Sequence, residues 1–168
     1  FAGVPQTGDE RFEGLLRAID TVPTRAQLDH GWPDAKNRLL TAAKNDKRDD
    51  YTRLRALTML SFYPDAPMVR AGLEALSSHP SVEVRRLAVY TMARTFGQPG
   101  DKALVAFVEA ATKDPEPQVA EHAVRGLRWI DAPAAHEALS RLIQQGRTKT
   151  LKTLAARTSK RRIRRLAR

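Results

Sequence analysis

The chain has 168 residues, of which 42% are hydrophobic and 6% aromatic, and its 29 Lys and Arg against 19 Asp and Glu give a formal net charge of +10. This length and apolar content suit one domain with a buried core, and there is no stretch of about 18 or more apolar residues to span a membrane. The lack of cysteine excludes disulfides, thiolate metal sites and thiol catalysis. Few aromatics beside abundant Ala and Leu favour packed helices over a β-sandwich. The chain begins with Phe1, so its compartment stays open between the cytoplasm and, if a signal peptide has been removed, the periplasm or the cell exterior.

Residues 1–32 are predicted to form a lead-in and a capping helix. Residues 1–8 hold closely spaced Gly and Pro, which favours an extended segment. Residues 9–22 show the helical spacing i, i+3, i+4 and i+7 on one apolar face, formed by Phe12, Leu15, Leu16 and Ile19. A second, short helix is expected from Thr24 to His30, and Trp32 is expected to cover the open end of the fold.

Four aspartates stand where the N-cap of a helix is expected, and they recur at intervals of 30 to 36 residues: Asp34, Asp65, Asp101 and Asp131. An Asp side chain accepts hydrogen bonds from free N–H groups at a helix start, and Pro fits the first turn. Both features occur in Asp-Ala-Pro at 65–67 and again at 131–133. The amphipathic segments that follow are predicted to be the first helices of four hairpins.

A second kind of segment follows each first helix. Its first apolar residue serves as a register mark, and the marks lie 30 to 35 residues apart: Leu54, Val84, Val119 and a weaker Leu151. Three residues after each mark we expect core positions, at Leu57, Leu87, His122 and Leu154. The next residue is small and would let neighbouring helices approach closely, at Thr58, Ala88, Ala123 and Ala155. Self-similarity at this period predicts stacked helical hairpins.

In these second segments, Asp-Pro-x-x-x-Val-Arg followed three residues later by Ala resembles the second-helix signature of HEAT repeats, in the short bacterial form also seen in phycobilin-lyase-type HEAT-like proteins. Residues 79–92 match through Pro80, Val84, Arg85 and Ala88. Residues 114–127 keep Asp114, Pro115, Val119 and Ala123 but have Ala120 in place of Arg. Residues 49–62 keep Asp49, Leu54 and Arg55 but have Thr58 in place of Ala.

This resemblance implies an all-α fold, a right-handed α-solenoid of about four HEAT-like hairpins with an extra N-terminal helix and a basic C-terminal helix. The repeats would occupy residues 33–146. The resemblance also implies that Arg55 and Arg85 pair with a turn acid of a neighbouring repeat.

The charge surplus is confined to residues 147–168, which contain ten basic residues and no acidic one. The basic residues are Arg147, Lys149, Lys152, Arg157, Lys160, Arg161, Arg162, Arg164, Arg165 and Arg168. We expect a basic C-terminal helix packed on the last repeat, either continuous or broken near Thr158-Ser159. Unbalanced charge costs stability unless a partner neutralises it, so this segment predicts contact with an anionic partner.

Catalytic and metal-binding patterns are missing from the sequence. Its four His are scattered, and it contains no P-loop, His-Glu-x-x-His or Gly-x-Ser-x-Gly motif. His122 is interpreted as a packing histidine. We therefore predict that the protein is not an enzyme and needs neither cofactor nor metal.

Second helices usually line the inner, concave wall of such stacks, which is the usual binding surface. Tyr and Arg often carry binding energy, and Arg pairs with carboxylate or phosphate. The predicted groove residues are Tyr63, Arg86, Tyr90, Arg125, Arg128 and Trp129. Trp129 is either a ligand-stacking platform or a hydrophobic clasp to the next hairpin.

These features predict a non-enzymatic HEAT-like scaffold or adaptor. It would bind a protein partner or larger assembly through its concave groove and an anionic partner through residues 147–168. The alternative is a nucleic-acid-binding protein that places the tail and the groove arginines on phosphates. A third option is peripheral contact of the basic helix with anionic lipid.

Overall fold

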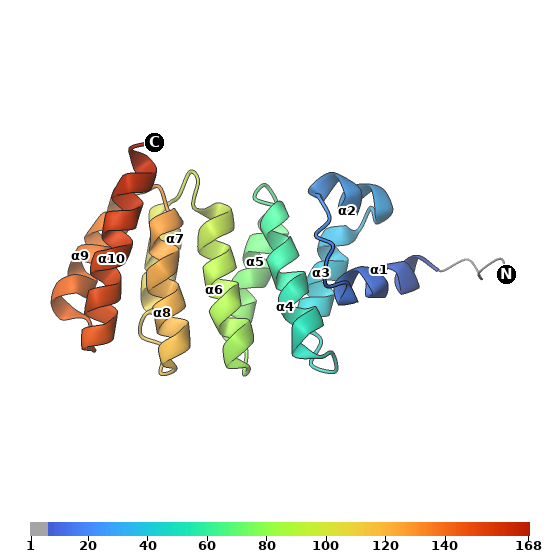
Figure 1. The fold of residues 1–168 in the computed structure, drawn as a ribbon, viewed down its shortest axis with the longest axis horizontal. Helices are drawn as coiled ribbons and strands as arrows, with labels where there is room; N and C mark the ends of the chain where they lie inside the picture. The colour runs from blue at the N-terminus through green and yellow to red at the C-terminus, as the bar shows by residue number, and fades with distance from the viewer. Residues whose placement is uncertain (1–6) are drawn as a thin grey trace.

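The computed structural model describes residues 7–168, so most of the extended segment expected over residues 1–8 lies outside the described part. Every regular element between residues 7 and 168 is a helix, and no strand occurs there. Figure 1 shows the helices as pairs standing side by side in one row, from the N-terminal to the C-terminal end. This arrangement confirms the predicted all-α solenoid of stacked hairpins.

Two short helices precede the repeats, α1 (Gly8–Arg17) and α2 (Arg25–Gly31). Each begins with a capping box, in which a Thr side chain accepts a hydrogen bond from the backbone N–H three residues later. Ile19 was expected on the apolar face of the first helix, but α1 ends at Arg17 and Ile19 is 81% exposed. That prediction is wrong because the chain turns out of the helix at Ala18, whose backbone is extended.

Trp32 closes the N-terminal end of the stack, as expected. Its indole N–H donates to the carbonyl oxygen of Gly8 at 2.9 Å, and its ring meets the Phe12 ring edge-on at a centroid distance of 5.4 Å. The contact ties α1 to the segment after α2.

Four helical hairpins follow. They pair α3 (Ala35–Lys44) with α4 (Asp50–Met59), α5 (Pro67–Leu76) with α6 (Val82–Phe96), α7 (Lys102–Ala111) with α8 (Pro117–Gly126), and α9 (Pro133–Gln145) with α10 (Lys149–Leu166). Single 3-10 turns, η1 (Leu60–Phe62) and η2 (Leu127–Trp129), extend α4 and α8. The second helices form a layer of their own, because α6 packs between α4 and α8, and α8 packs on α10.

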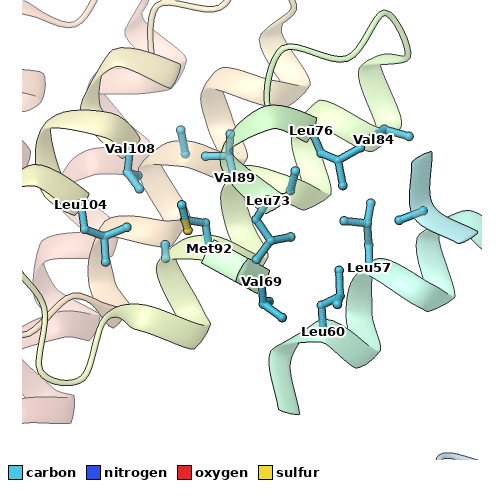
Figure 2. Packing of buried hydrophobic residues seen from close by; sticks show 14 of the residues in the cluster. Leu57, Leu60, Val69, Leu73, Leu76, Val84, Val89, Met92, Leu104 and Val108 are labelled. Carbon is cyan, nitrogen blue, oxygen red and sulfur yellow. The ribbon is translucent and has the colours of Figure 1, made fainter. Parts of the chain in front are cut away.

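The hydrophobic core runs between the two layers without a break. Figure 2 shows side chains from α4, α5, α6 and α7 meeting in one cluster. The labelled members are Leu57, Leu60, Val69, Leu73, Leu76, Val84, Val89, Met92, Leu104 and Val108. The second helices approach each other closely at small residues: a Cβ added to Gly126 of α8 would lie 3.0 Å from the Cβ of Ala93 of α6.

The register of α4 differs from the predicted one by two residues. Thr58, expected at the close-packed position, is exposed, and the mark Leu54 is only half-buried. Ala56 is fully buried instead and occupies the place that Ala88 and Ala123 take in α6 and α8. The marks Val84, Val119 and Leu151 are buried as predicted. Apolar residues fill five of the seven positions from 54 to 60. Periodicity alone therefore favours neither the register with Thr58 at the close-packed position nor the one with Ala56 there.

Of the predicted N-caps, only Asp101 caps its helix with its side chain, accepting a hydrogen bond from the Leu104 N–H at 2.6 Å. Asp34 stands at the N-cap of α3 without such a bond. Its carboxylate accepts from Arg38 Nε at 2.7 Å instead. Asp34 is therefore the N-cap residue of α3, as predicted, but its side chain does not make the capping hydrogen bond.

In both Asp-Ala-Pro sequences the Ala is the N-cap and the Pro is the first helical residue, so the Asp lies outside the helix. The N-cap predictions for Asp65 and Asp131 are therefore wrong. Each Asp accepts hydrogen bonds from an arginine of another helix: Asp65 from Arg25 of α2, and Asp131 from Arg165 of α10. Each carboxylate thus makes a hydrogen bond to an arginine distant in the sequence in place of the predicted bond to the backbone N–H groups of its own helix.

The basic C-terminal segment forms one continuous helix, α10, without a break at Thr158-Ser159. It packs on α9 and on α8, so it is the second helix of the fourth hairpin. Its apolar side is buried through Leu151 and Ala155. The stack thus ends in a complete hairpin whose last helix carries the charge surplus.

Candidate binding surface

The exposed side of α4, α6, α8 and α10 forms one surface, here called the second-helix face. Its outward positions lie two and six residues after the buried alanines, and all are exposed or half-buried. They hold Thr58 and Phe62 in the first repeat, Tyr90 and Arg94 in the second, Arg125 and Trp129 in the third, and Arg157 and Arg161 in the fourth. The face is thus uncharged at these positions near the N-terminal end and basic from α6 onward.

Arg85 joins two repeats beneath this face. Its Nε donates to the carboxylate of Asp114 at 3.0 Å and its Nη2 at 3.3 Å, while Nη1 donates to the His79 carbonyl oxygen at 3.0 Å. Asp114 lies in the turn before α8, so Arg85 pairs with a turn acid of the next repeat as expected. Burial alone would raise the pKa of Asp114, but hydrogen bonds from Arg85 and from the Glu116 N–H hold that pKa below its ordinary value.

The matching residue in the preceding repeat is Arg53, not the predicted Arg55. Arg53 is buried, binds Asp46 at 2.9 Å and lies 3.1 Å from Nε2 of His79. Arg55 donates to backbone carbonyl oxygens of the N-terminal segment, including that of Leu15 at 3.1 Å. The exchange follows from the two-residue shift in the register of α4.

Arg86 and Tyr90 of α6 meet His122 of α8. Arg86 Nη1 donates to His122 Nε2 at 2.9 Å, and His122 Nδ1 donates to the Gln118 carbonyl oxygen at 2.9 Å. The Tyr90 and His122 rings lie edge-to-face, 6.0 Å apart. Burial, together with the guanidinium groups of Arg86 and Arg125, lowers the pKa of His122, which therefore packs as a neutral imidazole.

Trp129 stands at the centre of the basic half of the face. Its indole N–H donates to the Tyr90 hydroxyl at 3.1 Å, which ties the third repeat back to the second. Three guanidinium groups lie near its ring, with centroid distances of 4.4 Å for Arg128, 5.7 Å for Arg94 and 5.9 Å for Arg165. We call Arg94, Arg128, Trp129 and Arg165 the Trp129 cluster.

The positive charge of this cluster is compensated only in part. Arg165 forms an ion pair with Asp131 and also donates to the Arg128 carbonyl oxygen at 3.0 Å. Arg94 and Arg128 have no acidic partner among residues 7–168, and the buried Nε of Arg128 has no hydrogen-bond partner there. Two guanidinium groups are thus held around one ring without an acidic partner in the described part of the chain.

A hollow of about 390 Å³ lies one helical turn away, between α8 and α10. Its lining consists of Glu121, Arg125, Lys149, Thr150, Thr153, Leu154 and Arg157. Glu121 pairs with Arg125 at 2.9 Å, which leaves Lys149 and Arg157 as its uncompensated charges. The hollow and the Trp129 cluster adjoin along α8.

The ten basic residues of 147–168 take different roles. Arg162 is buried and donates to the carbonyl oxygens of Ile130 and Ala132, so the prediction that it contacts an anionic partner is wrong. Burial lowers the pKa of Arg162. Arg147 donates to the Asp114 carbonyl oxygen and also lines the space beside Thr148. With Arg165 bound to Asp131, the exposed remainder is Lys149, Lys152, Arg157, Lys160, Arg161, Arg164 and Arg168.

Tyr63 does not lie on the second-helix face, so its placement there was wrong. It is fully buried, and its hydroxyl donates to Asp29 at 2.9 Å. The cause is again the register of α4. Tyr63 directly follows η1 and is buried, and it occupies the position that the buried Ile130 takes directly after η2. Arg94 was omitted from the predicted site. The sequence does carry a signal for Arg94: it lies six residues after Ala88, just as Trp129 lies six residues after Ala123.

The apolar side of α10 is used for packing on α8 and α9, and Leu154 is also partly buried against the core. Only Ile163 and Leu166 remain exposed among its large apolar residues. This leaves little apolar surface for insertion into a lipid interface, which needs a broad apolar face.

Among residues 7–168 no helix is long and apolar enough to cross a membrane, and no cluster of three His, Asp or Glu side chains could hold a metal ion. The described face contains arginines and aromatic rings: Arg86, Arg125 and the Trp129 N–H are occupied by neighbouring groups, whereas Arg94, Arg157 and Arg161 have no acidic partner in the described chain.

The comparison with protein families agrees with the geometry. A family model described as HEAT repeats matches residues 69–160, more than half of the chain. The chain belongs to the HEAT-repeat family. No curated protein sequence matches it. HEAT repeats generally act as scaffolds for protein–protein interaction, and the match spans the basic half of the second-helix face.

Proposed function

We propose that this HEAT-repeat protein is a non-enzymatic scaffold whose second-helix face binds an acidic protein partner. The observation that carries the proposal is the uncompensated positive charge of that face from α6 to α10. Arg94, Arg128 and the exposed basic residues of α10 have no acidic partner among residues 7–168. Such a surface repels itself in the free protein, and a complementary acidic surface removes that cost.

Two acidic residues on the face favour a protein partner. Glu83 pairs with Arg86, and Glu121 pairs with Arg125, both between the basic positions. Mixed charge of this kind suits a protein surface with its own pattern of charges, whereas it would repel the continuous phosphate backbone of a nucleic acid. Arg, Tyr and Trp are also the residues that most often dominate protein interfaces.

A charge-reversal variant tests the proposal. Arg157→Glu, Arg161→Glu and Arg164→Glu should reduce capture of the partner from nuclease-treated cell extract at least about tenfold, because like charges across an interface cost several kcal/mol. The matched control reverses three exposed lysines away from this face, Lys44→Glu, Lys102→Glu and Lys113→Glu, and should capture normally. Bound proteins are identified by mass spectrometry. Equal capture by both variants would reject the second-helix face as the binding surface.

A second candidate function, nucleic-acid binding, is favoured by the spacing of charge on α10. At 3.6 residues per turn, the exposed basic residues of α10 fall within about half of the helix circumference: Lys149, Lys152, Arg157, Lys160, Arg161 and Arg164. If that side contacts phosphates, affinity for a DNA or RNA duplex falls steeply as salt increases. A weak or salt-insensitive interaction with both duplexes would eliminate this candidate.

A further inference from the structure

The Trp129 ring is not free for stacking on a base. Its N–H is taken by Tyr90, and the guanidinium of Arg128 lies 4.4 Å from its centroid. A guanidinium over an indole face is attracted by the ring quadrupole, whose negative potential lies on the π face, so its N–H groups keep a defined direction. Trp129 therefore positions arginines to bind an oxyanion and does not itself provide a platform for a nucleotide base.

The anion that fits must reach two arginines of different repeats. Arg94 comes from α6 and Arg128 from η2, and neither has an acidic partner among the described residues. A carboxylate or phosphate placed beside the ring would accept from the terminal N–H groups of the two guanidinium groups, because Arg128 Nε itself is buried. Charge-assisted bonds from arginine to such groups are roughly twice as strong as bonds between neutral groups.

The hollow between α8 and α10 provides a second anion site at a defined distance. We call the hollow, with Arg125 and Arg157, the lower tier and the Trp129 cluster the upper tier. Arg125 and Trp129 are four residues apart, so the two tiers are about 6 Å apart along the helix direction. Side chains at i and i+2 of an extended peptide point the same way and are about 7 Å apart. One extended segment can therefore place two acidic side chains in the two tiers.

We propose that the Trp129 cluster and the adjoining hollow form a two-tier site for an extended acidic peptide segment with Asp or Glu at alternate positions. The proposal rests on the proposed scaffold function and names the chemistry of its partner. Glu121 lies in the lower tier and Leu154 forms part of its wall, which suits a peptide better than a chain of phosphates.

Binding of fluorescently labelled probes by anisotropy tests the site on the full chain. The first probe is a peptide of alternating Glu and Ser, the second has the same residues as one Glu block and one Ser block, and the third is oligothymidylate of equal charge. We expect the alternating peptide to bind at least about tenfold more tightly than the other two. Preference for oligothymidylate, or equal binding of both peptides, would overturn the proposal.

Two sets of substitutions localise the effect. Arg94→Gln with Arg128→Gln should weaken binding of the alternating peptide at least about tenfold, whereas Lys102→Gln with Lys113→Gln, the same loss of charge on exposed residues elsewhere, should change it less than about twofold. Unchanged binding by the first pair contradicts the site. Because Arg94 is exposed, its single substitution provides a variant that leaves the packing of Trp129 intact if the pair fails to fold.

The two proposals can fail separately. If no peptide binds but reversal of Arg157, Arg161 and Arg164 still abolishes capture of the partner, the scaffold function stands and the two-tier peptide site is wrong. If the alternating peptide binds as expected and capture is unaffected, the site is real and the wider face is not the docking surface.

Discussion

Some arginines of the second helices are held by packing contacts, and others have no acidic partner in the described chain. Arg53, Arg85 and Arg162 are held beneath the surface: Arg53 by Asp46 of its own hairpin and His79 of the next, Arg85 by Asp114 of the next hairpin, and Arg162 by the Ile130 carbonyl oxygen at the start of the fourth hairpin. Arg94 and Arg128 have no acidic partner among residues 7–168. The first group should control stability, and the second should control binding.

Arg85→Ala should lower the free energy of unfolding by about 2 kcal/mol or more. Its side chain and that of Asp114 are only 15% and 14% exposed, so the substitution leaves a largely buried carboxylate without its partner. Urea denaturation measures the loss. The exposed pair between Arg25 and Asp65 is the control, and Arg25→Ala should cost clearly less stability than Arg85→Ala. Equal losses would show that burial does not set the difference.

The same pair predicts a dependence on pH. Because the fold lowers the pKa of Asp114 from 3.8, the pair contributes its full stability above that value and loses it as the pH falls through the lower pKa of the folded state. The acid-induced loss of stability should therefore be smaller in Arg85→Ala than in the wild type. An identical pH profile for the two proteins would contradict this assignment.

At the scale of elements, the turn between α6 and α7 fixes how the second and third hairpins meet. The Gly97 carbonyl oxygen accepts a hydrogen bond from the Asp131 N–H at 2.7 Å. A Cβ on Gly97 would lie less than 3.0 Å from the carbonyl oxygens of Ala93 and Trp129. The lack of a side chain is what allows this turn to rest against the end of η2.

Gly97→Ala should destabilise the protein by about 1–3 kcal/mol, because backbone atoms must move to admit the methyl group. Gly14→Ala is a matched control: it lies within α1, and an added Cβ meets nothing within 4 Å. That substitution should stabilise the protein by about 0.5–1 kcal/mol through helix propensity. Thermal unfolding distinguishes the two signs, and a stabilising Gly97→Ala would show that the turn is looser than described.

At the scale of the whole molecule, each hairpin is covered mainly by its neighbours in the row. The stability of such a stack is a sum of repeat and interface contributions. α10 covers both α9 and α8, so it belongs to the fold as well as to the proposed binding surface. Removing it would uncover apolar residues of the last two hairpins.

Truncation to residues 1–146 should therefore disorder α9 as well. Ala138 and Leu139 of α9 are fully buried in the complete chain, and α9 has no second helix to pack against after truncation. We expect the melting temperature to fall by about 5 °C or more. Amide hydrogen exchange should become fast over residues 133–145 but stay slow in α5 and α6. Persistent protection of α9 would mean that α10 is only an appended helix.

The number and order of the hairpins can be predicted from the sequence, because the spacing of Leu, Val and Ala along a helix is a local property. The all-α fold and the buried marks Val84 and Val119 follow from that spacing, and the basic character of α10 follows from the composition of residues 147–168. Periodicity failed in α4, where apolar residues are too dense to define one register. The N-cap preference of Asp failed separately at Asp65 and Asp131, which instead accept hydrogen bonds from an arginine of another helix.

Which charges are free to bind could be known only from packing. Arg162 and Arg94 look alike in the sequence, yet one is buried against carbonyl oxygens about 30 residues away and the other stands beside Trp129 without an acidic partner in the described chain. A charged side chain is neutralised by groups that the stacking of repeats brings near it, and sequence spacing does not encode those distances. The proposed binding surface therefore depends on how the hairpins stack, whereas each hairpin can be predicted from its own stretch of sequence.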